Sequence, residues 1–117
     1  MTTYDSDNVF AKILRGEIPS ERIYEDAEFI VIRDVAPVAP THVLVIPRAA
    51  RSGPDALTEA DVFWLGRMVL VATKVAADLG LTGAGYRLVM NEGREGGKAV
   101  PHLHMHIVGG KELGPIA

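Results

Sequence analysis

His102-Leu103-His104-Met105-His106, followed by Ile107-Val108, places three of the four histidines of this chain at alternating positions. A β-strand repeats every two residues, so an extended backbone puts the three imidazoles on one face and the apolar side chains on the other. Alternate residues of a strand lie roughly 6.5 to 7 Å apart, close enough for neighbouring imidazoles to share one small anion or metal ion. The stretch therefore predicts a core strand that also carries a site.

Composition restricts the class of protein and the kind of site. The 117 residues are 48% hydrophobic, which is typical of one folded domain spanning residues 1–117. The chain has no cysteine, so disulfides, thiolate catalysis and zinc–thiolate sites are excluded, and a metal would need histidine or carboxylate ligands. A net charge of −3 argues against a nucleic-acid partner and favours a small anionic ligand such as a nucleotide.

The chain shows no targeting or membrane-spanning pattern. Arg67 and Lys74 interrupt its most hydrophobic region, so no membrane span is predicted. The residues from Met1 to Phe10 carry acidic groups and lack the basic stretch followed by an apolar stretch that marks a signal peptide. We therefore expect a cytoplasmic protein that does not bind membranes.

Five strands and two helices are predicted along the chain. A short helix is expected over 8–15, where apolar residues recur at helical spacing before Gly16 and Pro19. The residue types predict a hairpin with arms at 22–24 and 28–32, and strands at 42–46 and 86–90. The histidine stretch at 102–108 is expected to form the fifth strand.

The second helix is expected to cover about twenty residues, from the capping pattern Thr58-Glu59-Ala60-Asp61 to a C-cap at Gly80. Its apolar residues form two stripes, the first with Val62, Leu65, Val69, Ala72, Ala76 and Leu79, and the second with Trp64, Met68, Val71 and Val75. One sheet rarely needs both stripes, so the first is expected on the chain's own sheet and the second against another copy in a homodimer. Alternatively, the chain's own loops cover the second stripe.

A glycine turn leads directly into the histidine strand. Gly96-Gly97-Lys98-Ala99-Val100 matches neither a phosphate loop nor a dinucleotide fingerprint. Glycine lets the backbone approach an anion closely, and successive exposed N–H groups form a small anion-binding concavity. The turn could be an ordinary connection, but its position beside three imidazoles favours an anion site.

The imidazole row has three interpretations. Nucleophilic catalysis comes first, because histidine attacks phosphorus well and an unperturbed imidazole is largely neutral near pH 7. A metal site comes second, since a straight row suits tetrahedral coordination poorly, and a structural or pH-sensing cluster comes third. Protonating one ring makes protonating its neighbour harder, so the row is expected to hold about one proton, giving one neutral nucleophile and one acid. His42 extends this proton network if its strand is a neighbour.

The stretch from His102 to Val108 matches the H-φ-H-φ-H-φ-φ signature of the histidine triad (HIT) superfamily. Nearly the whole chain resembles this superfamily, with further matching motifs at 10–13, 16–19, 34–37, 40–47 and 85–93. It is most similar to the Hint branch, the purine nucleoside phosphoramidases. The resemblance implies an α+β fold with one HIT domain, in which a five-stranded antiparallel sheet carries two helices and dimerises into a ten-stranded sheet.

The same resemblance implies a metal-free and cofactor-free hydrolase. The expected reaction cleaves the P–N bond of purine nucleoside phosphoramidates, or cleaves aminoacyl adenylates, through a nucleotidyl-histidine intermediate that releases a nucleoside monophosphate. His104 would be the nucleophile, oriented by the His102 carbonyl. His102 and His42 would form a proton network, and His106 would contact phosphate and assist the leaving amine. The alternatives are a purine-nucleotide binding or regulatory module with incidental hydrolysis, and a dinucleoside polyphosphate hydrolase.

The resemblance also implies a nucleotide site. Its expected residues are Asn91 and the backbone of Ala99 and Val100 for the phosphate, Asp34 for the ribose, and Phe10, Ile13, Ile18, Ile32, Val35 and Leu44 for the purine. Asp34 and Asn91 could instead hold turns, and the apolar set could be ordinary core. Relatives often have serine at the position of Ala99 and an aromatic residue at that of Pro101, and many have a longer tail, so the leaving-group preference stays open.

Overall fold

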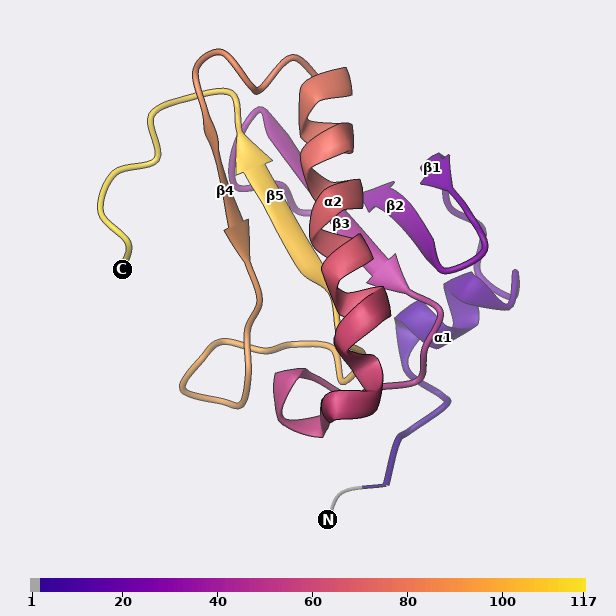
Figure 1. Cartoon of the computed structure of the whole chain (residues 1–117). Helices are drawn as coiled ribbons and strands as arrows, with labels where there is room; N and C mark the ends of the chain where they lie inside the picture. The colour runs from indigo at the N-terminus through magenta and orange to yellow at the C-terminus, as the bar shows by residue number, and fades with distance from the viewer. Residues whose placement is uncertain (1–2) are drawn as a thin grey trace.

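The predicted histidine strand lies inside a five-stranded antiparallel sheet with the strand order β1-β2-β3-β5-β4. The computed structural model describes residues 3–117 (Figure 1). Its elements are α1 (Val9–Leu14), β1 (Arg22–Glu25), β2 (Phe29–Arg33), β3 (Thr41–Pro47), the 3-10 turns η1 (Pro54–Ala56) and η2 (Glu59–Asp61), α2 (Val62–Asp78), β4 (Tyr86–Val89) and β5 (Met105–Gly109). The predicted fold class is therefore confirmed.

The histidine strand is shorter than predicted, because β5 begins at Met105 rather than at His102. Val45 pairs with Met105, so continuing this register would set Pro47 opposite Leu103. Proline has no N–H to donate to the ladder. The N–H of Leu103 donates instead to the Arg51 carbonyl at 2.7 Å, outside the sheet. The apolar side of the predicted alternation is nevertheless present, since Leu103, Met105 and Ile107 all belong to one buried cluster.

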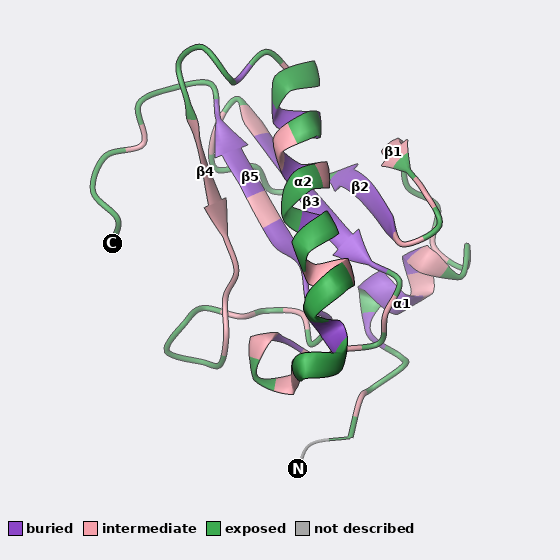
Figure 2. Ribbon diagram, in the orientation of Figure 1, coloured by how far each residue is buried: buried purple, intermediate pink, exposed green. Residues whose placement is uncertain are grey.

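The two faces of the sheet bury different clusters. Alternation along β2 and β3 sends Phe29, Val31, Val43 and Val45 toward α2, which crosses one face in Figure 1. The intervening residues Ile30, Ile32, Leu44 and Ile46 face α1. They form a second cluster with Phe10 and Ile13 of that helix. Figure 2 shows burial concentrated in β2, β3 and β5, with less buried strands at both edges. The histidines lie on the face opposite α2.

Asp61 anchors the start of α2. It forms the predicted capping box with Thr58, accepting the Thr58 N–H at 2.9 Å, and it also accepts the Trp64 indole N–H at 2.9 Å. The Arg51 guanidinium donates to the Asp61 carboxylate at 2.9 and 3.2 Å. This guanidinium is the main reason that the pKa of Asp61 is lowered to about 2. The capping therefore depends on a carboxylate that stays ionised.

The predicted division of α2 into two stripes is wrong. The residues buried against the sheet are Met68, Ala72, Val75 and Ala76, which combine members of both stripes. Val62 and Val69 of the first stripe are exposed, together with Phe63 and Leu70. Apolar residues occupy so much of the helix circumference that spacing alone does not select the face that meets the sheet.

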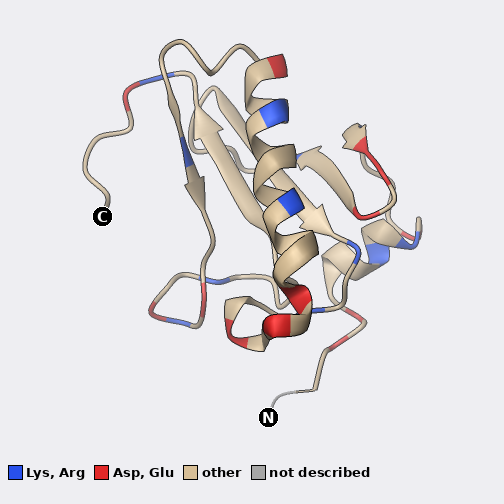
Figure 3. Cartoon of the chain, viewed as in Figure 1, with Lys and Arg blue, Asp and Glu red and all other residues tan. Residues whose placement is uncertain are grey.

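Charge and hydropathy add two observations. Figure 3 shows Lys and Arg spread over helices, strands and loops among acidic residues, with acids grouped at the start of α2. Neither helix within residues 3–117 combines the length and apolar character that a membrane span needs.

Candidate functional site

His104 is held by the backbone of its own segment. Its Nδ1 lies 2.7 Å from the His102 carbonyl oxygen. A carbonyl only accepts, so Nδ1 carries the proton and the lone pair of the neutral ring is on Nε2. Phe10 of α1 packs edge-on against the imidazole, with ring centroids 4.9 Å apart. The residue is 8% exposed, so the ring is oriented and largely shielded from water.

His102 is anchored through both ring nitrogens. Its Nε2 donates to the Pro47 carbonyl at 2.7 Å, which leaves Nδ1 as the acceptor. The hydroxyl of Tyr4 donates to that nitrogen at 2.5 Å. The Asn8 side-chain amide in turn donates to the Tyr4 oxygen at 3.0 Å. This ring is therefore a neutral Nε2–H tautomer whose two nitrogens contact Tyr4 and Pro47.

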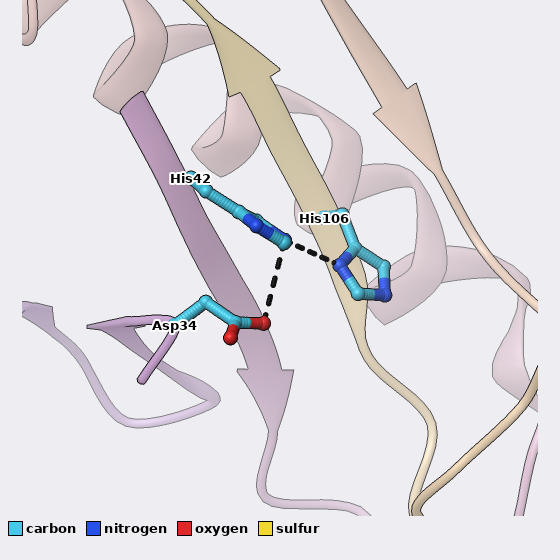
Figure 4. Close-up of side chains that lie close together, drawn as sticks. All are labelled: Asp34, His42 and His106. Carbon is cyan, nitrogen blue, oxygen red and sulfur yellow. Dashed lines mark hydrogen bonds and ion pairs between the residues drawn. The ribbon is translucent and has the colours of Figure 1, made fainter. Parts of the chain in front are cut away.

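His42 and His106 form a second pair, shown with Asp34 in Figure 4. The Val38 N–H donates to Nδ1 of His42 at 3.2 Å, so the neutral His42 ring carries its proton on Nε2. The Nε2–H of His42 donates to Nδ1 of His106 at 2.8 Å, and Asp34 Oδ2 lies 3.4 Å from Nε2 of His42. His42 is therefore joined to His106 and not, as predicted, to His102.

The tautomer of His106 follows from this chain of contacts. Because its Nδ1 accepts, the neutral ring carries its proton on Nε2 and can donate it. Its ring centroid lies 5.0 Å from that of His104. One ring thus offers a lone pair and its neighbour offers a proton, both on the same face of the sheet.

Burial keeps His102, His104 and His106 uncharged in the free protein. Desolvation is the main cause that lowers the pKa of His102 and His104, and with the neighbouring imidazoles it lowers the pKa of His106 to about 4. The expectation of about one shared proton is therefore wrong for the free protein at pH 7. The mutual repulsion that was predicted is present, but the loss of hydration is larger.

The glycine turn contains free donors. Gly97 has a φ of +79°, which only glycine adopts readily, and the Asn91 side-chain amide donates to the Gly96 carbonyl at 2.7 Å. Lys98 pairs with Glu92 at 2.7 Å, so its charge is already matched. Within residues 3–117, no hydrogen-bond acceptor is found for the N–H groups of Ala99 and Val100. These two N–H groups can bind an anion next to the histidines.

The expected purine set is divided between core and surface. Phe10, Ile13, Ile32 and Leu44 are buried in the cluster beneath α1, and Ile18 and Val100 pack against that cluster. Val35 differs, since its side chain is fully exposed. Asp34 does hold a turn, because its Oδ1 accepts the Ala36 N–H at 2.8 Å.

A cavity of about 410 Å³ lies beside His106. His42 and His106 line one side, Asn91 and Arg87 of the β4 segment line another, and Lys111 of the C-terminal tail completes it. The Arg87 guanidinium donates to the Gly114 carbonyl at 2.7 Å and so holds the tail in place. No motif in the sequence singles out Arg87, although its two-residue alternation with Val89 and Asn91 places all three on one face.

The same region contains a set of groups that could hold a metal ion. Asp34, His42 and His106 each offer one ligand atom, and these atoms lie within 4.8 Å of one another. This trio differs from the histidine row considered in the sequence. Nε2 of His42 and Nδ1 of His106 already contact each other at 2.8 Å, so an ion bound through these two nitrogens would have to break that contact.

The sequence and the fold are similar to those of known proteins. Residues 15–113 match the HIT domain. The chain is 44% identical over 110 residues to the purine nucleoside phosphoramidase of Escherichia coli K12, covering 94% of this chain and 92% of that protein. A HIT family hydrolase from Clostridium thermocellum aligns with a TM-score of 0.89 at 42% identity, covering 93% and 95% of the two chains. A histidine triad protein from Clostridium difficile aligns with a TM-score of 0.91 at 35% identity, covering 98% and 100%.

Proposed function

Since this chain belongs to the HIT family and is an enzyme related to HIT hydrolases, we propose that it cleaves the P–N bond of purine nucleoside phosphoramidates. The products are a nucleoside monophosphate and an amine. One observation carries the proposal, namely the tautomer of His104, whose Nδ1–H donates to the His102 carbonyl and leaves Nε2 as a nucleophile. The relative named purine nucleoside phosphoramidase supports the substrate class.

In the first step, Nε2 of His104 attacks the α-phosphorus and the P–N bond breaks. The attacking ring keeps its Nδ1 proton and becomes cationic, and the 2.7 Å bond to the His102 carbonyl stabilises that charge. The bound phosphate anion raises the pKa of His106 from its low value in the free protein, so that this ring binds a second proton on Nδ1 and the hydrogen bond from His42 Nε2–H to that nitrogen breaks. Protonated His106 then gives its Nε2 proton to the departing amine.

In the second step, water attacks the phosphorus of the nucleotidyl-histidine. His106, now neutral, takes the proton of the water, and His104 leaves as a neutral imidazole. Both rings return to the states in which they entered the phosphoryl-transfer cycle. The same residue therefore acts as acid and then as base, as general acid–base catalysis requires.

The remaining residues bind and orient the nucleotide in this proposal. The Asn91 amide and the N–H groups of Ala99 and Val100 contact phosphate oxygens, and Asp34 contacts the ribose. The purine lies against Phe10, Ile13, Ile18, Ile32, Val35 and Leu44. The cavity beside His106 receives the leaving amine.

One observation favours a second candidate. Arg87 and Lys111 place two cations at the cavity beside His106. An anionic leaving group such as the second nucleotide of a dinucleoside polyphosphate suits them, so hydrolysis of dinucleoside polyphosphates is the second candidate.

The test measures hydrolysis of adenosine 5′-phosphoramidate in the presence of EDTA. Chromatography quantifies the AMP that is released. The wild-type protein is compared with His104→Ala and with Lys74→Ala, a control in an exposed ion pair on α2. We expect His104→Ala to lose about 10³-fold or more of kcat and the control to lose none. Equal AMP release by His104→Ala and wild type would refute the nucleophile. Faster turnover of diadenosine tetraphosphate would favour the second candidate, and binding of AMP without turnover of either substrate would indicate a binding module.

A further inference from the structure

We propose that Tyr4 is a positioning residue for the nucleophile, because its hydroxyl holds the His102 ring and thereby the carbonyl that orients His104. This inference rests on the proposed function of His104. Tyr4 and His102 are 98 positions apart in the chain, and their side chains meet at 2.5 Å. Their rings are edge to face, with centroids 5.7 Å apart and planes inclined by 70°.

The direction of each hydrogen bond in this cluster is determined. The Pro47 carbonyl only accepts, so Nε2 of His102 donates to it and Nδ1 must accept. The Tyr4 hydroxyl therefore gives its proton to Nδ1, and the Asn8 amide donates to the Tyr4 oxygen at 3.0 Å. The Tyr4 hydroxyl thus donates to His102 and accepts from Asn8, the N-cap residue of α1.

Asn8 connects this cluster to the start of α1. Its Oδ1 caps the helix by accepting the Ala11 N–H at 2.9 Å, and its amide also donates to the Asp5 carbonyl at 2.7 Å. The helix it caps carries Phe10, which packs against the His104 ring. The segment before α1 is therefore linked to His102 through Tyr4, and α1 is linked to His104 through Phe10.

The His102 carbonyl is held from two sides, neither of them the β-ladder, because β5 begins at Met105. The carbonyl shares one peptide plane with the N–H of Leu103, which donates to the Arg51 carbonyl at 2.7 Å. The other support is the His102 side chain, whose anchoring fixes the Cα from which this peptide starts. That side chain is 1% exposed, so a missing hydroxyl would leave Nδ1 buried without its donor. The ring would then rotate or admit water, and the carbonyl would move with it.

The hydroxyl can be separated from the ring by substitution. Tyr4→Phe removes only the oxygen, whereas Tyr4→Leu also removes the aromatic packing. Tyr24→Phe is a matched control, because Tyr24 donates a similar hydrogen bond, at 2.7 Å to Asp26, in a different part of the fold. The readouts are kcat and KM with adenosine 5′-phosphoramidate, the melting temperature, and the ¹⁵N chemical shifts of the imidazoles.

We expect Tyr4→Phe to lower kcat about 10-fold with little change in KM, because misorientation affects attack more than binding. The Nδ1 resonance of His102 should shift in Tyr4→Phe and stay unchanged in Tyr24→Phe. An unchanged kcat in Tyr4→Phe overturns the proposal, as does a loss confined to Tyr4→Leu, which would assign the effect to ring packing. Equal losses of kcat in both Phe variants would also overturn it.

The two proposals fail in different ways. If the wild-type protein does not hydrolyse the phosphoramidate, the proposed function fails, while the chemical shifts still test the bond between Tyr4 and His102. If the wild type is active and Tyr4→Phe keeps its kcat, only the positioning role fails.

Discussion

Nε2–H of His42 donates to Nδ1 of His106 across 2.8 Å, and this contact leaves the other nitrogen of His106 as the proton donor. The tautomer of His42 is itself set by the Val38 N–H, which donates to Nδ1 of His42 at 3.2 Å. A backbone amide thus sets the tautomer of a ring two contacts away. The order of donors and acceptors separates the roles of His104 and His106, although both are histidines on one face.

The loss caused by His106→Asn should depend on the basicity of the leaving amine. An alkylamine needs a proton as the P–N bond breaks, so we expect a loss of about 10² to 10⁴ in kcat with an alkyl phosphoramidate. A nitroaniline leaves more easily unprotonated, so its loss should be below about 10-fold. Steady-state rates on the two adenosine substrates check this, and equal losses on both would assign His106 to phosphate binding alone.

The alternation of histidines with Leu103, Met105 and Ile107 was sufficient to predict which side chains face the core, because strand geometry depends only on local period. The hydrogen-bond partners of these rings could not be predicted in the same way. The partners of His102 and His106 come from Tyr4, Pro47 and His42, and no local pattern links these residues to the histidine stretch. The start of β5 at Met105 likewise depends on a distant residue, Pro47, which the register sets opposite Leu103.

Stability should decrease as the pH falls from about 6.5 toward 4. Burial lowers the pKa of His106 to about 4, against about 6.5 in an unfolded chain, and lowers those of His102 and His104 as well. Between these pH values the unfolded chain binds more protons than the folded one, so protonation favours unfolding. The pKa of Asp61, lowered to about 2, matters only at still lower pH, below its ordinary value of 3.8.

Thermal melts across this pH range provide the measurement. The melting temperature of the wild type should fall between pH 6.5 and 4.5, and the slope should be smaller in His106→Asn, whose side chain does not titrate. Identical slopes in the two proteins would show that His106 does not contribute to the pH dependence.

Chelation should leave hydrolysis unchanged, because the proposed nucleophile, His104, lies outside the potential metal trio of Asp34, His42 and His106. Added Zn²⁺ should instead inhibit, since coordination would remove the hydrogen bond between His42 and His106. Asp34→Asn should weaken that inhibition. Rates in EDTA and in graded Zn²⁺ test both points, and activity that EDTA abolishes and Zn²⁺ restores would reinstate a metal mechanism.

The homodimer remains a prediction, but the face that it uses is revised. The stripe first expected at the interface includes Met68 and Val75, which are buried against the chain's own sheet. The apolar residues left exposed on α2 include Phe63 at 79% and Leu70 at 68%. Phe63 and Leu70 are seven positions apart and therefore lie on one face of α2. An exposed apolar face is typical of a surface that another protein covers, and a second copy is the partner we expect.

Sedimentation equilibrium at micromolar concentration decides between one chain of 12.6 kDa and a pair of twice that mass. We expect the wild type to sediment as the pair and the double variant Phe63→Glu, Leu70→Glu to sediment as one chain, because two carboxylates in the interface would lose hydration without gaining partners. Val35→Glu is the matched control, since it changes a fully exposed apolar residue outside α2 and should leave the mass unchanged. A wild-type mass of one chain would refute the dimer. A double variant that still sediments as a pair would place the interface elsewhere, because the two substitutions change apolar side chains of α2 that the sheet leaves uncovered.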